Sequence, residues 1–134
     1  MKPIPRATYR LQFHSGFGFD HAVQIADYLR ELGISHVYAS PYLQAAPGST
    51  HGYDVTDPCF VNAELGGEDG HKRFCRALED QSLGQILDVV PNHMAVSHPR
   101  ANKWWWDVLK NGRTSPYAGF FDIDWDPPEK RLAG

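Results

Sequence analysis

Several features that would assign a protein to a class at once are scarce in this sequence. Its 134 residues contain only two cysteines, Cys59 and Cys75, and their spacing is not the CxxC of a metal or redox site. No stretch approaches the ~18 consecutive apolar residues of a membrane helix, and the N-terminus has no apolar segment of the kind found in signal peptides. We therefore expect reduced thiols, a cytoplasmic location and no membrane partner.

The charge balance and the motif content exclude further classes. A formal net charge of −3 and an isoelectric point near 6.1 leave no basic surface for nucleic acid. The sequence contains no HExxH, Walker A or GxSxG motif, and its histidines form no tight cluster. An acidic run at 122–126 resembles the start of a calcium loop, but Pro127 stands where such a loop needs glycine. We expect neither a bound metal nor a cofactor.

The pattern of apolar residues predicts alternating strands and helices. Strands are predicted at 7–13, 37–39 and 85–90, and helices at 20–32, 68–81 and 101–110. Asp20 is the predicted N-cap of the first helix, and Gly33 ends it. The segment 42–67 is rich in glycine and proline, so we expect it to be irregular, while its aromatic residues argue against disorder. This order favours a parallel α/β sheet.

Polar side chains accompany the third predicted strand. Asp88 interrupts an apolar, β-branched run that is stopped by Pro91 and followed by Asn92 and His93. A carboxylate in such a strand is costly to bury unless it is paired, which predicts an arginine partner. In barrels of alternating strands and helices the chemistry lies at this carboxyl end of the strands. The alternative is purely structural: Asp88 pairs internally and Asn92 caps the turn after Pro91.

A second candidate motif is the sequence His51-Gly52-Tyr53-Asp54. Gly52 permits a backbone conformation that other residues avoid. The ring of Tyr53 can stack on the face of a sugar, and the carboxylate of Asp54 can accept hydrogen bonds from sugar hydroxyls. The alternative is that the tyrosine packs within the loop and that Asp54 makes a local turn.

Three consecutive tryptophans, Trp104 to Trp106, lie on the helix predicted at 101–110. At ~100° per residue they spread over about 200° of the helix surface, so they cannot all face one core. Packing in a core or an interface is the favoured role. The alternative is that these tryptophans, together with Tyr53, form a stacking platform for a ligand. Asp122 and Asp124 are interpreted as a solvated acidic turn rather than as a pair of glycosidase carboxylates.

Together these motifs resemble the α-amylase superfamily of glycoside-active barrels. Residues 88–93 match the first signature of the superfamily, at the third strand, and residues 51–54 match the segment after the second strand. The chain more specifically resembles the maltooligosyltrehalose synthase family within that superfamily. This closer resemblance extends over most of the chain, at 8–13, 32–38, 40–41, 48–55, 64–67, 91–95 and 120–125.

The resemblance implies an α/β fold that forms the first part, about three βα units, of a (β/α)8 TIM barrel. A complete barrel of this kind needs about 250 residues. The whole chain, 1–134, would then be one partial catalytic domain. Strands 1–3 and helices 1 and 2 would occupy about 1–95, and the start of an insertion after strand 3 would occupy about 96–134.

The resemblance also implies an activity. The family converts the reducing-end α-1,4 linkage of a maltooligosaccharide into an α,α-1,1 linkage by intramolecular transglucosylation, and its nucleophile, general acid/base and third carboxylate lie on the fourth, fifth and seventh strands. No catalytic residue is therefore expected in this chain, and we expect it to be inactive alone. The alternatives are an α-glucan hydrolase of the same superfamily and a non-catalytic glucan-binding module.

The matching positions imply roles for six residues. Tyr53, Asp54 and His93 would bind the maltooligosaccharide, Tyr53 by stacking and His93 near the 6-hydroxyl of the same sugar. The supporting residues would be Asp88, as the anchor of an arginine on the fourth strand, together with Asn92, which holds the loop, and His51. An α-glucan is thus the expected partner.

Overall fold

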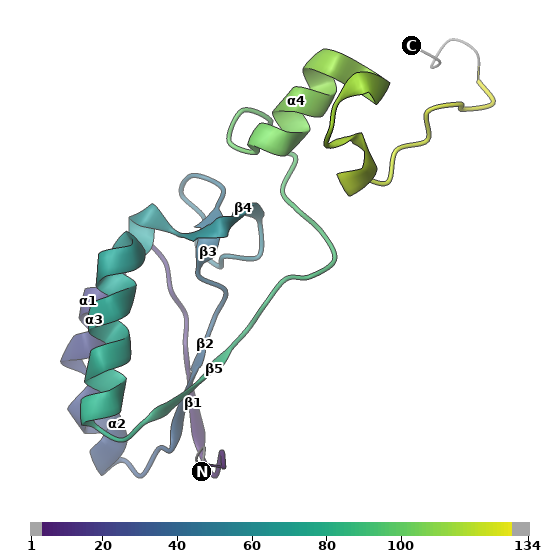
Figure 1. Cartoon of the computed structure of the whole chain (residues 1–134). Helices are drawn as coiled ribbons and strands as arrows, with labels where there is room; N and C mark the ends of the chain where they lie inside the picture. Colours follow the sequence, from purple (N-terminus) through teal and green to yellow (C-terminus); the bar gives the residue numbers. More distant parts are fainter. Residues whose placement is uncertain (1–3, 130–134) are drawn as a thin grey trace. The chain divides into compact units, whose positions relative to one another are not determined.

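The computed structural model describes residues 4–129, and the chain divides into two compact units. The first unit runs from Met1 to Ala95 and the second from Val96 to Gly134 (Figure 1).

A three-stranded parallel sheet forms the centre of the first unit. Its strands are β1 (Thr8–Leu11), β2 (His36–Ala39) and β5 (Gly84–Leu87), in the order β1-β2-β5. These are the three strands that the apolar runs predict: β1 is shorter than its predicted range, β2 begins one residue earlier, and β5 begins one residue earlier and ends three residues earlier. The register aligns Arg10 with Tyr38, and Tyr38 with Ile86. The predicted parallel α/β arrangement is therefore confirmed.

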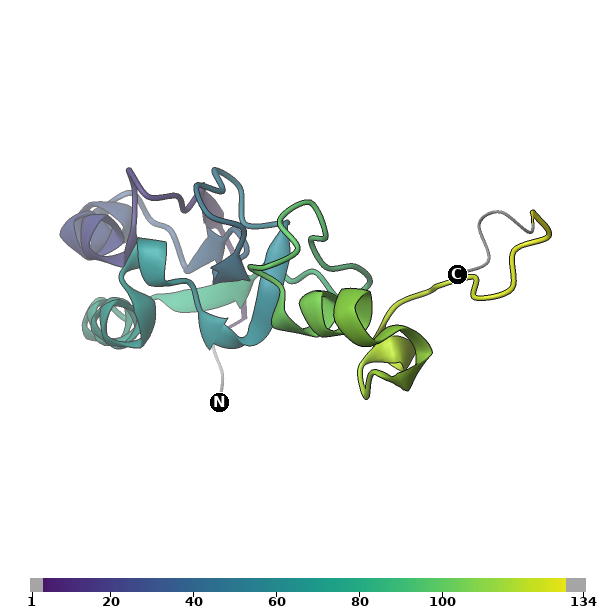
Figure 2. The ribbon, with the colours of Figure 1, turned by 90° about the horizontal axis from the view of Figure 1, so that it is seen from above.

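Three helices cover one face of this sheet: α1 (Phe19–Gln24), α2 (Ala26–Glu31) and α3 (Gly67–Asp80) (Figures 1 and 2). The prediction of one continuous helix over 20–32 is wrong at Ile25, which separates α1 from α2 with φ −111° and ψ 5°. The predicted N-cap is also wrong, because the helix begins earlier, after Gly18, and places the completely buried Phe19 in its first turn. Asp20 instead forms an ion pair with Arg73 of α3 at 2.8 Å.

The segment predicted to be irregular contains a two-stranded antiparallel sheet. Its strands are β3 (Leu43–Ala45) and β4 (Val55–Val61), followed by the short 3₁₀ helix η1 (Ala63–Leu65). The register shifts twice along this pair, and Pro58 lies within β4. Because bulges and an internal proline break the strict alternation of a strand, the periodicity gave no signal here.

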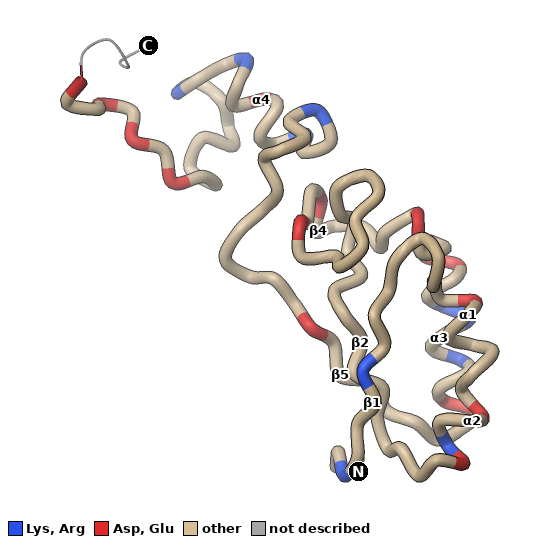
Figure 3. Tube along the Cα trace, turned by 180° about the vertical axis from the view of Figure 1, so that it is seen from behind, with Lys and Arg blue, Asp and Glu red and all other residues tan. Residues whose placement is uncertain are grey.

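The hydrophobic core lies between the sheet and the three helices. Its largest fully buried members, Phe13, Phe19 and Phe74, are at most 1% exposed, and their ring centroids lie 5.2–5.8 Å apart. Charged residues gather on the helices of this unit, and few interrupt its strands (Figure 3). One face of the sheet is thus covered by an apolar layer.

The other face of the sheet carries alternate residues of the strands, among them Arg10, Tyr38 and Ile86, which share one register level. Two residues toward the amino ends of the strands, His36 is aligned with Gly84. A Cβ atom on Gly84 would collide with the imidazole of His36, so the ring occupies the space that a side chain on β5 would need. In a closed barrel this face would be the interior.

The second unit is built around α4 (Lys103–Asn111), whose N-cap is the buried Asn102. Trp104 packs against Tyr117 and Phe120, Trp105 against Phe121, and Trp106 lies beneath the cations of Arg100 and Lys110. The prediction that the tryptophans do not share one core is confirmed. The short 3₁₀ helices η2 (Gly112–Thr114) and η3 (Ala118–Phe120) follow α4.

Both cysteines are free, Cys59 exposed and Cys75 half-buried, as the sequence predicts. Among residues 4–129, no helix has the length and apolarity that a membrane crossing requires.

Candidate functional site

The two sequence motifs converge at the carboxyl end of the parallel sheet. Tyr53 lies in the loop that joins β3 to β4, and Asp88 directly follows β5. The hydroxyl of Tyr53 donates a hydrogen bond to Oδ2 of Asp88 at 2.5 Å. Residues 35 positions apart in the sequence are thereby joined by their side chains.

Asp88 is the acceptor of three side-chain donors. Its Oδ2 atom accepts from Tyr53, from the hydroxyl of Tyr38 at 3.1 Å and from Nη1 of Arg10 at 3.2 Å. The hydrogen bond from Tyr53, together with those from Tyr38 and Arg10, lowers the pKa of the Asp88 carboxyl below its ordinary value. The same hydrogen bond raises the pKa of the Tyr53 hydroxyl. Asp88 is therefore an anion near neutral pH, and its predicted arginine partner is confirmed.

That arginine comes from β1 and was not identified from the sequence. Arg10 also donates to the Tyr53 hydroxyl at 3.0 Å and to Oε1 of Gln12 at 3.3 Å, and its guanidinium carbon lies 4.8 Å from the centroid of the Tyr38 ring. The sequence signal that could have identified Arg10 is the alternation of side chains along β1, which places this cation on the face of the sheet opposite to Leu11.

The loop before Tyr53 is held by a glycine and a carboxylate. Gly52 has φ +77°, and a Cβ atom there would collide with the carbonyl oxygen of Pro41. The Ser49 hydroxyl donates to Oδ1 of Asp54 and accepts from the backbone N–H of Gly52 at 3.0 Å. Asp54 thus closes the loop that carries Tyr53.

His51 and His93 flank Tyr53. Nε2 of His93 lies 3.2 Å from the carbonyl oxygen of Tyr53, and Nδ1 lies 3.1 Å from Oδ1 of Asn92. The carbonyl oxygen of Tyr53 and the amide oxygen of Asn92 both accept hydrogen bonds, and a neutral imidazole donates from only one of its nitrogens, so each tautomer of His93 donates in one of these two contacts. Nδ1 of His51 accepts from the backbone N–H of Tyr53 at 3.1 Å, and the two rings stack at 6.0 Å. The structure therefore brings all six predicted residues to one end of the sheet.

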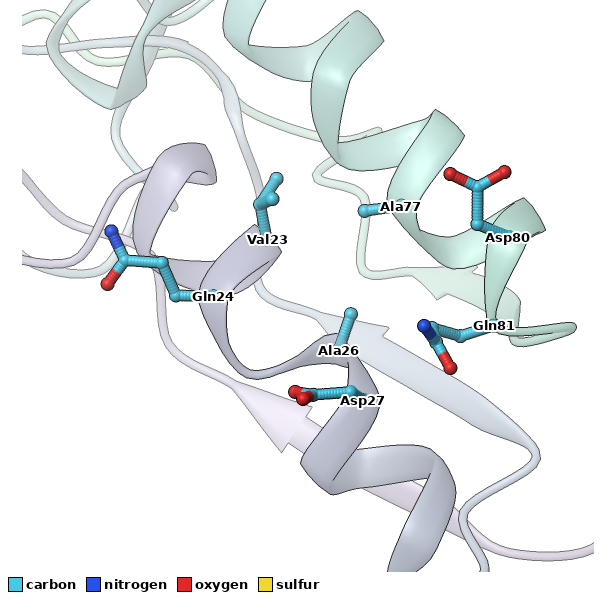
Figure 4. Close-up of a pocket in the computed structure, with 7 residues that line it drawn as sticks. All are labelled: Val23, Gln24, Ala26, Asp27, Ala77, Asp80 and Gln81. Atoms are coloured by element: carbon cyan, nitrogen blue, oxygen red, sulfur yellow. The ribbon is translucent and has the colours of Figure 1, made fainter.

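A groove of about 270 Å³ lies elsewhere, between α1 and α2 on one side and α3 on the other (Figure 4). It is lined by Val23, Gln24, Ala26, Asp27, Ala77, Asp80 and Gln81. The lining residues of α3 come from the part of that helix that leads into the start of β5. The groove is therefore at the amino ends of the strands, away from Tyr53 and Asp88. In (β/α)8 barrels the active site lies at the carboxyl ends of the strands, the end opposite to this groove.

Within the described part of the chain, no three His, Cys, Asp or Glu side chains are grouped so that they could hold a metal ion. The polar groups of the site are instead bound to one another. Two of the groups open to a ligand are Tyr53, which is 36% exposed as a residue, and Oδ1 of Asp88, which accepts from none of the described residues. An aromatic face beside hydrogen-bonding groups is suited to a polyhydroxylated ring.

Comparison with known families assigns the class of the protein. Residues 22–132 match the family described as alpha amylase, catalytic domain. The chain belongs to this family, whose catalytic domain is a TIM barrel.

Among individual proteins, the chain is similar to maltooligosyl trehalose synthases. It is 52% identical to a protein of that name from Mycobacterium tuberculosis over 94% of this chain and 17% of the relative. The α-amylase SusG of Bacteroides thetaiotaomicron is 32% identical over 89% of this chain. The structure of maltooligosyltrehalose synthase from Arthrobacter ramosus superimposes with a TM-score of 0.89 and 47% identity, covering 90% of this chain and 16% of that protein. The chain thus spans about a sixth of the length of these relatives.

Proposed function

We propose that this chain is the N-terminal part of a maltooligosyltrehalose synthase, the substrate-binding beginning of its catalytic barrel. The observation that carries the proposal is the difference in similarity: 52% identity to a synthase, against 32% to an α-amylase, over nearly the same stretch. The site geometry supports it, because Tyr53, Asp88 and His93 meet at the carboxyl end of the strands.

In the proposed reaction, the bond that breaks is the α-1,4 linkage at the reducing end of a maltooligosaccharide. A carboxylate outside this chain forms a glycosyl ester, and a carboxylic acid protonates the oxygen of the departing glucose. The anomeric hydroxyl of that glucose then attacks the ester in place of water and forms the α,α-1,1 linkage. Atoms balance without a co-reactant, so the reaction is an isomerisation.

Within this reaction the residues of the chain bind and orient the sugar. The Tyr53 hydroxyl is already engaged by Arg10 and Asp88, so its ring is the part that stacks on glucose. Asp54 and His93 contribute hydrogen bonds to sugar hydroxyls, and each exchanges a local contact to do so. Asp88 keeps Oδ1 for the arginine expected on the fourth strand, while Asn92 and His51 hold the loops.

The test is product analysis with the full-length protein that carries this sequence. After incubation with maltopentaose, we expect a non-reducing oligosaccharide of unchanged mass, with an α,α-1,1 terminus visible by NMR. Smaller reducing sugars would instead establish a hydrolase, the alternative that the similarity to α-amylases favours. Binding of maltopentaose without any product would establish a glucan-binding module.

A further inference from the structure

Arg10 occupies the centre of the polar network at the candidate site. It lies on β1, the strand that contributes none of the six residues predicted from the motifs. Its guanidinium donates to three different side chains, those of Asp88, Tyr53 and Gln12, at 3.2, 3.0 and 3.3 Å. No other described side chain joins both Tyr53 and Asp88 to β1.

The groups around Arg10 fit the planar shape of its guanidinium as well as its charge. The group lies over the Tyr38 ring at 4.8 Å while its edges donate to the three acceptors. A lysine carries the same charge, but it lacks the planar fork and cannot stack in this way. The geometry is therefore specific to arginine.

Two partners of Arg10, Tyr53 and Asp88, are the groups whose positions must be fixed if the Tyr53 ring is to stack on a sugar. Tyr53 is at the end of a loop whose glycine has a positive φ, and its ring is partly exposed. Arg10 donates to the Tyr53 hydroxyl and to Asp88, so it contacts both ends of the Tyr53–Asp88 hydrogen bond. Without Arg10, the Tyr53 hydroxyl loses one of its two contacts and Asp88 loses its arginine partner.

We infer that Arg10 is a positioning residue for substrate, which orients the Tyr53 ring and Asp88 for an α-glucan without touching the sugar itself. This inference rests on the proposed function and deepens it. It assigns to β1 a role in substrate binding that the two motifs do not contain. Fixing a stacking ring before the ligand arrives raises affinity because less ordering is required on binding.

The test is steady-state kinetics on maltopentaose with the full-length protein and its Arg10→Met variant. We expect kcat/KM to fall about tenfold to hundredfold, the effect of misplacing a binding group by roughly 1 Å. Arg73→Met is the matched control: Arg73 makes an ion pair with Asp20 at 2.8 Å between α1 and α3, away from the site. The control is expected to keep the kcat/KM of the wild type.

Two further variants separate positioning from general stability. In a Tyr53→Phe background, where the hydroxyl is absent, Arg10→Met should lower kcat/KM by about threefold at most, because coupled groups are not additive. Arg10→Lys retains the charge and should keep most of the defect. It also provides a folded comparison should the methionine variant unfold.

The possible outcomes are distinct. Equal kcat/KM for Arg10→Met and Arg73→Met, full activity of Arg10→Lys, or additive losses in the Tyr53→Phe background would each overturn the inference while leaving the proposed function intact. If the wild-type protein neither binds nor converts maltopentaose, the proposed function fails, and the inference fails with it.

Discussion

At the scale of the residue, the hydroxyl of Tyr53 lies between a cation and an anion. It accepts from Arg10 and donates to Asp88, so its direction is determined at both ends. The ring is consequently oriented by groups that are not part of its own loop. This arrangement ties the loop between β3 and β4 to the parallel sheet through side chains alone.

The ring of Tyr53 is expected to contribute most of its binding energy by stacking. Replacing it in Tyr53→Ala should weaken the binding of maltopentaose by about tenfold, the equivalent of roughly 1.4 kcal/mol, which is within the range of aromatic stacking. Tyr28→Ala is the control, because Tyr28 is 56% exposed on α2, on the helical side of the sheet. Fluorescence titration measures both variants, and equal affinities would refute the role of Tyr53.

Asp88 should make the stability of the protein depend on acidity. Its pKa is held below the ordinary value of 3.8 by hydrogen bonds from Tyr53, Tyr38 and Arg10. The ionised carboxylate therefore stabilises the fold above pH 3.8, and this contribution is lost as the pH falls through the lowered folded-state pKa. Melting temperatures of the wild type and Asp88→Asn should differ at pH 6 and converge as the pH falls below 3.8. A difference that is independent of pH would contradict this assignment.

At the scale of the element, the parallel strands and helices followed from the sequence because their apolar patterns are regular. Val37 and Ala39 of β2 are completely buried, and the α3 pattern repeats through Phe74 and Leu78. Two features of the fold were not predicted from the sequence. The β3–β4 pair is bulged and contains a proline, and the break at Ile25 leaves the helical spacing of buried residues almost unchanged.

The candidate site, too, was predictable from the sequence only in part. Tyr53, Asp88 and His93 belong to compact motifs, and their convergence follows from parallel strands ending at one edge. Arg10 was missed because it stands within an alternating strand whose other face is apolar, and a single cation there gives no local signal. Its importance arises from contacts 43 and 78 positions away in the sequence.

The loop 46–54 offers a matched pair of glycines. Gly48 and Gly52 have φ of +74° and +77°, but only at Gly52 would a Cβ atom collide with another group, the carbonyl oxygen of Pro41. Gly48→Ala should cost about 1–2 kcal/mol of stability from the backbone conformation alone. Gly52→Ala should cost more and should also weaken maltopentaose binding. Thermal melts and titrations test this, and equal effects of the two variants would show that the close approach to Pro41 is unimportant.

At the scale of the whole molecule, the described part of the chain contains three parallel strands of a fold that closes with eight. β1 and β5 each have one edge that pairs with no strand among residues 4–129. Unpaired edges favour association with other chains, and the inner face of the sheet carries Arg10 and Tyr38 in a partly exposed setting. Among the described residues, the side chains of Arg10 and Asp88 are 36% and 18% exposed.

Residues 1–134 produced alone should have no synthase activity. The carboxylates implied for the reaction lie on strands that are not among those described, and binding groups without them give no turnover. Incubation of this purified chain with maltopentaose should yield no trehalosyl product, while light scattering should detect association of the molecules. Formation of the product above trace level would show that the catalytic groups lie within these residues.

The imidazole of His36 occupies the inner face of the sheet where β2 and β5 begin, directly over Gly84. A side chain at position 84 would therefore have to displace this ring, so the absence of a side chain there is what lets the imidazole pack between β2 and β5 at their amino ends. The polar groups of the candidate site lie at the opposite, carboxyl ends of the same strands.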